Sequence, residues 1–126
     1  MAPPDFDDGT ALFLDLDGTL LEIAATPELV VVPPMLPGVL RQLHALLGGA
    51  LAIVSGRSLK TIDHLLEPFI CAAAGEHGVS LRLGDGTVEE MPAGLGLPER
   101  WRDSLAAAAE RWPGVLIEPK PHGCAV

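Results

Sequence analysis

Two carboxylates stand two positions apart at the end of an apolar run near the start of the chain. The run is residues 11–14, and Asp15 and Asp17 follow it. A short apolar run of this kind predicts a strand buried on both faces, as in a parallel sheet covered by helices. The carboxyl ends of such strands face the ligand crevice, and residues two apart on a strand point the same way. We therefore expect both carboxylates to address one small ligand.

This pair of acids predicts phosphate chemistry that is assisted by a metal ion. Like charges so close together repel, and a hard divalent cation stabilises them, so Mg²⁺ is the first candidate and Asp15 and Asp17 are its expected ligands. A carboxylate can also attack phosphorus to form an aspartyl-phosphate, while a second carboxyl group protonates the leaving oxygen and later activates water. Gly18 permits a tight turn, and Thr19 offers a hydroxyl and an N–H to the phosphate.

Two other interpretations of residues 15–18 stay open. The segment can be an ordinary turn, because Asp and Gly are common in turns. It can also be compared with a calcium-binding EF-hand loop, which needs oxygen ligands at alternating positions and Gly at the sixth. Here Gly is the fourth residue, and Leu20 and Leu21 follow it. The calcium interpretation therefore fits the spacing poorly.

A second apolar run, residues 51–54, ends in Ser55, Gly56 and Arg57. A helix is expected to begin near Ser58, and main-chain N–H groups at the start of a helix bind anions. We therefore predict that Ser55 and Gly56 hold a phosphate oxygen, with the positive charge of Arg57 close by. Taken alone, the segment favours a helix start that is capped by Ser58 and binds nothing. Its pairing with Asp15 and Asp17 reverses that preference.

The rest of the pattern predicts the elements that must position these residues. Strands and helices alternate along the first half of the chain, which implies a parallel sheet with right-handed crossovers and an α/β fold. Two further strands flank Gly84–Gly86 and predict a hairpin. The expected elements are strand 11–15, helix 36–47, strand 50–55, helix 58–67, strand 69–74, hairpin strands 79–83 and 87–91, helix 98–112 and a strand beginning at 115–118.

Aromatic and sulfur-containing side chains are mostly assigned to packing. Trp101 and Trp112 recur at helical spacing, so we expect them in the core of a second subdomain rather than stacked on a sugar. Cys71 and Cys124 lack metal-ligand spacing and are predicted to be free, buried thiols. His77 follows the expected end of a strand, and it either orients the substrate or is a hydrogen-bonded structural histidine.

Composition and charge exclude several classes of protein. The formal net charge of the 126 residues is −9, which argues against nucleic-acid binding. No apolar run is long enough to span a membrane, and the N-terminus lacks the features of a signal peptide, so we expect a cytoplasmic protein. The same negative charge repels an anionic substrate. Local positive charge must therefore come from a metal ion, Arg57 and the helix start that follows Ser55.

Four motifs together resemble those of a known family. Asp15-Leu16-Asp17-Gly18-Thr19 resembles the first signature of the haloacid dehalogenase superfamily of aspartate-nucleophile phosphatases, and residues 52–57 resemble its second signature. Val54-Ser55-Gly56-Arg57, Ala74-Gly75-Glu76-His77-Gly78 and Glu118-Pro119-Lys120, in this order, are similar to motifs of the trehalose-6-phosphate phosphatases. The similarity covers nearly all of residues 10–126.

The resemblance implies a fold, a reaction and a set of substrate contacts. The fold would be α/β, a Rossmann-like parallel sheet core of the haloacid dehalogenase type with part of an α+β cap. Residues 1–91 would be the N-terminal part of the core and residues 92–126 the start of the cap. The reaction would be Mg²⁺-dependent hydrolysis of trehalose 6-phosphate in trehalose biosynthesis, through an aspartyl-phosphate. Asp15 would attack phosphorus, and Asp17 would protonate the leaving sugar oxygen and then activate water. The residues implied to contact the sugar phosphate are Arg57, His77, Glu118 and Lys120.

The resemblance also implies what lies outside this sequence. Family members continue for roughly another hundred residues, a usual domain length, so we expect an N-terminal fragment that is weakly active or inactive alone. We expect Lys60 to point away from the crevice, and the strand that begins at 115–118 to have no partner. A trehalose-phosphate synthase, fused or associated, is the implied protein partner. The alternatives are a phosphatase of sucrose phosphate or glucosylglycerol phosphate, and a catalytically dead domain that binds a sugar phosphate or a partner protein.

Overall fold

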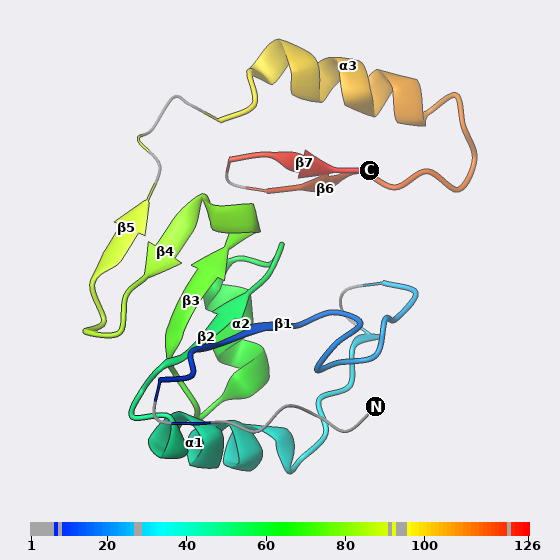
Figure 1. The fold of residues 1–126 in the computed structure, drawn as a ribbon. Coiled ribbons are helices and arrows are strands. Elements are labelled where there is room, and N and C mark those ends of the chain that lie inside the picture. Colours follow the sequence, from blue (N-terminus) through cyan, green and yellow to red (C-terminus); the bar gives the residue numbers. More distant parts are fainter. Residues whose placement is uncertain (1–6, 8, 27–28, 91, 93–95, 121) are drawn as a thin grey trace. The chain divides into compact units, whose positions relative to one another are not determined.

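The computed structural model of the protein describes residues 7, 9–26, 29–90, 92, 96–120 and 122–126. The chain divides into two compact units, Met1–Glu89 and Glu90–Val126 (Figure 1). The assignment of residues 1–91 to a core and 92–126 to a cap stays a prediction. The elements of the first unit are β1 (Leu12–Asp15), α1 (Leu36–Leu46), β2 (Leu51–Val54), α2 (Leu59–Leu66), β3 (Ala72–Gly75), the 3-10 helix η2 (Glu76–Gly78) and β4 (Ser80–Arg82), with β5 (Val88–Glu90) at the boundary.

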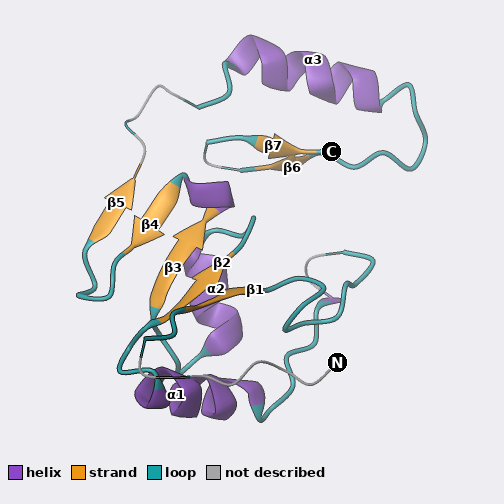
Figure 2. Ribbon diagram, in the orientation of Figure 1, coloured by secondary structure: helices purple, strands orange, loops and turns teal. Residues whose placement is uncertain are grey.

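The strands form one sheet in the order β1-β2-β3-β4-β5. The first three strands are parallel, and Leu14, Ile53 and Ala73 lie side by side in register. The chain then reverses, so that β4 runs antiparallel to β3 with Ala74 opposite Leu81. Helices alternate with the parallel strands along the chain, as the colours of Figure 2 show. This confirms the predicted α/β fold with a parallel sheet.

The helices of the first unit bury one face of this sheet. Leu40 of α1 and Ile62 of α2 pack in one cluster with Leu51 and Ile53 of β2. The opposite face is open in the part of the chain that the structure describes, and Phe13 on β1 is 70% exposed. The prediction that residues 11–14 are buried on both faces is therefore wrong. Among the described residues β1 is the first strand of the sheet, paired with β2, and its inward side chains contact the helices.

The third strand begins three residues later than the predicted start at residue 69. Phe69 does not extend the strand because its N–H donates to the carbonyl of Leu66 at 2.8 Å and closes the turn after α2. Its ring is buried in the core and meets the ring of His44 edge-on, with 5.8 Å between the centroids. The apolar character of this segment thus reflects core packing before the strand starts.

An ion pair ties the antiparallel strand to the helical layer. Both guanidinium Nη atoms of Arg82 donate to the carboxylate of Asp63 on α2, at 2.7 and 2.8 Å, and its Nε donates to the carbonyl of Cys71. These bonds to Asp63 raise the pKa of Arg82. Cys71 and Cys124 are free thiols, and burial raises the pKa of Cys71. Cys124 is only half-buried, so its predicted burial is wrong.

The predicted hairpin is present between β4 and β5. The N–H of Leu83 donates to the carbonyl of Thr87 at 2.9 Å, and that of Gly86 donates to the carbonyl of Leu83 at 3.0 Å. Gly86 has a φ of +86°, a conformation that glycine adopts without strain. Met91, the last residue of the expected second strand, lies outside the described residues.

The second unit contains α3 (Glu99–Ala109), β6 (Glu118–Pro119) and β7 (Cys124–Ala125). β6 pairs antiparallel with β7, so the prediction that this segment has no partner is wrong. The reversal is tight because the main chains of Lys120 and Gly123 exchange two hydrogen bonds, at 3.1 and 3.4 Å. Each strand is only two residues long.

The tryptophans of the second unit are exposed, contrary to the prediction that they form its core. Trp101 is 55% and Trp112 is 62% exposed. None of the eleven residues of α3, all of which the structure describes, is buried. Two strands of two residues offer too little surface to cover a helix of three turns. The predicted helix is present, but it ends at Ala109, so only Trp101 lies on it and Trp112 follows it. The prediction that both tryptophans are buried is wrong.

No helix among the described residues is long and apolar enough to cross a membrane.

A matched pair of leucines on α1 tests the location of the core. Leu40 is 1% exposed and Leu46 is 82% exposed. Leu40→Ala should lower the free energy of unfolding by about 2–5 kcal/mol, because it removes packed side-chain atoms and leaves a cavity. Leu46→Ala should change it by less than about 0.5 kcal/mol. Urea unfolding followed by far-ultraviolet circular dichroism measures both, and equal losses would contradict the described core.

Candidate functional site

The acidic segment begins where β1 ends. Asp15 is the last residue of β1 and is exposed, Leu16 is fully buried in the core, and Asp17 is half-buried. The hydroxyl of Thr19 donates to Oδ2 of Asp15 at 3.0 Å. The buried leucine therefore anchors the segment, while the threonine orients one carboxylate.

A tight turn after Asp17 brings Thr19 back toward β1. Gly18 has a φ of +87°, a conformation that glycine adopts without the strain of a side chain. The N–H groups of Leu20 and Leu21 both donate to the carbonyl of Leu16, at 3.0 and 2.8 Å, and the N–H of Gly18 donates to the carbonyl of Leu21 at 2.7 Å. The segment is thus a turn, as one interpretation of the sequence held, and the same turn arranges the polar groups.

Arg57 forms a bidentate ion pair with the carboxylate of Asp17. Its Nε donates to Oδ2 of Asp17 and its Nη2 donates to Oδ1, both at 2.8 Å. The arginine side chain is 13% exposed and the aspartate side chain 36%. The sequence analysis missed this pair, because 40 positions separate the two residues. The signal that could have revealed it is the register of β1 against β2, which places Asp15 beside Val54.

The turn between β2 and α2 combines a helix cap with the expected anion-binding groups. Ser58 caps α2 by accepting the N–H of Thr61 at 3.2 Å. Ser55 is buried, its N–H donates to the carbonyl of Ala74, and its Oγ accepts the N–H of Arg57 at 3.1 Å. The Ser55 hydroxyl proton is not used in that bond, so it can be donated to a phosphate oxygen.

The segment after β3 supports this turn from the side. Glu76 and His77 have φ values of 49° and 59°, in the left-handed region that costs a non-glycine residue roughly 1–3 kcal/mol. Their N–H groups donate to the carbonyls of Arg57 and Ser55, at 2.9 and 3.1 Å. These bonds hold the strained residues in place and fix the main chain of the turn after β2.

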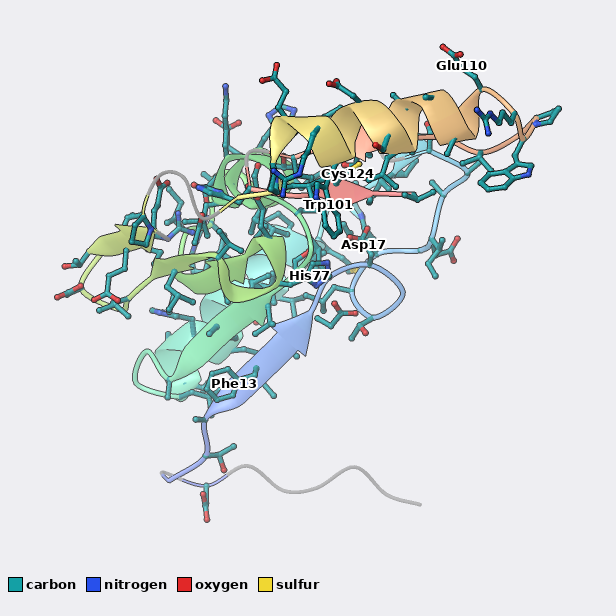
Figure 3. The ribbon with its side chains drawn as sticks, turned by 90° about the horizontal axis from the view of Figure 1, so that it is seen from above. Phe13, Asp17, His77, Trp101, Glu110 and Cys124 are labelled. Atoms are coloured by element: carbon teal, nitrogen blue, oxygen red, sulfur yellow. The ribbon has the colours of Figure 1, made fainter. Side chains whose placement is uncertain are left out.

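Two glycines permit this close approach. A Cβ on Gly56 would lie 2.6 Å from Nε2 of His77, so the imidazole ring rests directly against the glycine. A Cβ on Gly75 would lie 3.0 Å from the carbonyl oxygen of Arg57 and from the amide nitrogen of Leu59. Figure 3 labels His77 and Asp17, which both come after strands of the first unit.

The structure thus brings seven of the nine predicted site residues together in the first unit. They lie at or just after the carboxyl ends of β1, β2 and β3, and they are connected by the hydrogen bonds described above and by the packing of His77 against Gly56. They are Asp15, Asp17, Thr19, Ser55, Gly56, Arg57 and His77. The other two, Glu118 and Lys120, belong to the second unit and form their own ion pair, with 3.8 Å between Oε1 and Nζ. Lys60 lies exposed on α2.

Asp15 and Asp17 remain the candidate magnesium ligands. Among the described residues no group of three or more His, Cys, Asp or Glu side chains could hold a metal ion. Mg²⁺ does not require such a group, because it usually binds one or two carboxylates together with water and substrate phosphate. Both carboxylate oxygens of Asp17 already accept hydrogen bonds from Arg57. The donor set therefore fits Mg²⁺ through the side chain of Asp15 and the main-chain oxygen of Asp17.

Comparison with known proteins gives a family match over most of the chain. The family model described as trehalose-phosphatase matches residues 13–126. A probable trehalose-phosphate phosphatase of Sinorhizobium fredii is 49% identical over 113 residues, which are 90% of this chain and 42% of that protein. The trehalose-6-phosphate phosphatase of Escherichia coli K12 is 34% identical over 117 residues, 93% of this chain and 44% of that protein. The chain spans less than half the length of these curated relatives.

Solved structures show the same type of fold. A crystal structure of a trehalose-6-phosphate phosphatase related protein has a TM-score of 0.67 and 27% identity, over 88% of this chain and 48% of that one. The C-terminal domain of a C. albicans trehalose-6-phosphate phosphatase has a TM-score of 0.70 at 24% identity, over 87% of this chain and 39% of that one. A haloacid dehalogenase-like hydrolase from B. subtilis also matches in fold, with a TM-score of 0.54 at 18% identity, over 80% of this chain and 33% of that one. The predicted haloacid dehalogenase type of fold is thereby confirmed.

The close packing at Gly75 predicts that a methyl group there disturbs the site. Gly75→Ala should lower the free energy of unfolding by about 1–3 kcal/mol, because the Cβ meets main-chain atoms that cannot rotate away. Gly84→Ala is the matched control, since nothing lies within 4 Å of its Cβ, and it should change the value by less than about 0.5 kcal/mol. Urea unfolding and the amide NMR shifts of residues 55–59 measure the effect. Unchanged shifts in Gly75→Ala would contradict the described packing.

Proposed function

Because the chain belongs to the trehalose-phosphatase family, we propose that it carries the nucleophile and phosphate-binding half of an enzyme that hydrolyses trehalose 6-phosphate to trehalose and phosphate. The observation that supports this proposal is the joining of two segments at the ends of adjacent parallel strands. One segment holds Asp15 and Asp17, the other holds Ser55 and Arg57, and the Asp17–Arg57 ion pair connects them.

The carboxylates supply the covalent chemistry and the proton transfers. Asp15 attacks phosphorus, the bond from phosphorus to the sugar oxygen breaks, and Asp17 gives its proton to that oxygen, which releases trehalose. A water molecule then attacks the aspartyl-phosphate, and Asp17 takes its proton. Phosphate leaves and the Asp15 carboxylate is restored. The hydrogen bond from Thr19 to Oδ2 of Asp15 orients the nucleophile for the attack.

The turn after β2 holds the phosphate that reacts. Ser55 donates its hydroxyl proton to a phosphate oxygen, and the main-chain N–H groups at Gly56 and at the start of α2 add further donors. Such prearranged donors stabilise the charge that develops on the phosphoryl oxygens. The side chain of Asp15 and the main-chain oxygen of Asp17 would hold Mg²⁺, which when bound neutralises phosphoryl charge.

Glu118 and Lys120 provide the recognition of the sugar. Their charged groups lie 3.8 Å apart and can form charge-assisted hydrogen bonds with sugar hydroxyls. His77 is the substrate contact proposed on the side of the phosphate. The contact that the sequence predicted for Arg57 stays a prediction, because its guanidinium donates to Asp17. A cytoplasmic location and a synthase partner stay predictions, as do the incompleteness of the chain and its weak activity alone.

The decisive assay is the Mg²⁺-dependent release of phosphate from trehalose 6-phosphate. It should be run on the 126-residue chain and on a chimera in which this chain replaces the matched 113 residues of the S. fredii relative. We expect release by the chimera. Asp15→Asn should reduce it at least about a thousandfold, because the nucleophile is lost. Asp85→Asn, the same change at an exposed hairpin residue, should have no effect.

The outcomes of this assay separate the candidate functions. Faster hydrolysis of sucrose phosphate or glucosylglycerol phosphate than of trehalose 6-phosphate would assign the other substrate. No release of phosphate by a folded chimera would contradict the phosphatase proposal. Binding of a sugar phosphate without hydrolysis would then favour a catalytically dead binding domain.

The role of the second unit is tested by substitutions that leave the phosphate site intact. Glu118→Gln and Lys120→Met should each raise KM for trehalose 6-phosphate about tenfold or more, because charge-assisted bonds contribute about 1.5–3 kcal/mol. Hydrolysis of p-nitrophenyl phosphate, which has no sugar, should change less than about twofold, the range of a surface substitution. Glu110→Gln, an exposed residue just after α3, is the control. Equal losses on both substrates would contradict sugar recognition by this pair.

A further inference from the structure

We propose that Arg57 is a positioning residue, whose guanidinium group fixes the carboxylate of Asp17 in the orientation that proton transfer requires. This inference rests on the proposed function and gives Arg57 a role beyond contact with the substrate. It starts from the two hydrogen bonds of 2.8 Å that join the guanidinium to both oxygens of the carboxylate. Such a bidentate contact fixes the plane of the carboxylate as well as its distance from the guanidinium.

Asp17 needs such a partner because of where it lies. It follows the end of β1, in the turn at Gly18, and more than a third of its side chain is exposed. An aspartate whose side chain reaches solvent and has no fixed partner changes rotamer within nanoseconds. A misplacement of about 1 Å in a reacting group can cost a hundredfold in rate. The half-buried carboxylate of Asp17 therefore requires a fixed neighbour if it is to serve as acid and base.

Arg57 is itself held by its own main chain. Its N–H donates to Oγ of Ser55 at 3.1 Å, and its carbonyl accepts the N–H of Glu76 at 2.9 Å. Gly75 packs against the same carbonyl, at a distance that leaves no room for a side chain. The arginine side chain is largely buried. The strained turn after β3 is therefore connected through Arg57 to the carboxylate after β1.

The contact requires an arginine rather than any cation. The guanidinium is planar and presents two parallel N–H groups, whereas the ammonium group of lysine is a point charge that leaves a carboxylate free to rotate. In this structure the Nε and Nη2 groups of Arg57 both donate to the carboxylate of Asp17. The loss of Arg57 should therefore reduce turnover more than it reduces substrate affinity.

Steady-state kinetics separate positioning from substrate binding. In whichever of the two forms described above releases phosphate, Arg57→Lys and Arg57→Gln should lower kcat about 10- to 100-fold, with KM changed less than about threefold, as expected when an interaction of the transition state alone is lost. In an Asp17→Asn background, neither substitution should lower kcat further. Arg41→Lys and Arg41→Gln, at an exposed residue of α1, are the matched controls. A large rise in KM with kcat unchanged would overturn the proposal, as would additive losses.

A second readout needs no catalysis and keeps the two proposals separate. NMR three-bond couplings of the Asp17 side chain in the 126-residue chain should show one rotamer in the wild type and averaged rotamers in Arg57→Gln. Circular dichroism should show that both proteins are folded. A single, unchanged rotamer in Arg57→Gln would overturn the positioning role. If no form hydrolyses a sugar phosphate, the proposed function fails, and this measurement alone decides the role of Arg57.

Discussion

The site depends on two main-chain hydrogen bonds that join the turn after β2 to the turn after β3. The N–H groups of Glu76 and His77 donate to the carbonyls of Arg57 and Ser55. Without them, the left-handed residues 76 and 77 would relax, and the turn at 55–57 would lose its support. Small residues make the bonds possible, because a side chain at position 56 or 75 would hold the two turns apart. The motifs at 54–57 and 74–78 are therefore two halves of one packed structure.

The ion pairs of the first unit change the electrostatic expectation that the sequence suggested. Arg57 was expected to offset the net charge of −9 near an anionic substrate. Its guanidinium is instead shared with Asp17, and that of Arg82 is shared with Asp63. A phosphate approaching the turn after β2 therefore meets a neutralised pair rather than a free cation. Main-chain N–H groups, and the metal ion proposed at Asp15, must supply more of the attraction than the sequence implied.

Much of the fold follows from local pattern, and the remainder depends on contacts that local pattern does not contain. The apolar runs at 11–14 and 51–54 are followed by polar residues, which was enough to predict parallel strands whose ends carry the candidate site residues. Burial was harder to predict, because it depends on which layers cover a surface. Phe13 was expected inside for its place in an apolar run, and Trp101 for its helical spacing, yet both are exposed. The contact of Arg57 with Asp17 needed the strand register, which no single segment of the sequence specifies.

The position of the aromatic residues has a spectroscopic consequence. The chain has two tryptophans and no tyrosine, and both tryptophans lie in the unit Glu90–Val126. Intrinsic fluorescence therefore reports on that unit alone, and the emission of two exposed indoles is already close to that of an unfolded chain. The unit with Asp15 and Arg57 contributes no comparable emission. A flat fluorescence trace during denaturation would therefore carry no information on the state of the sheet.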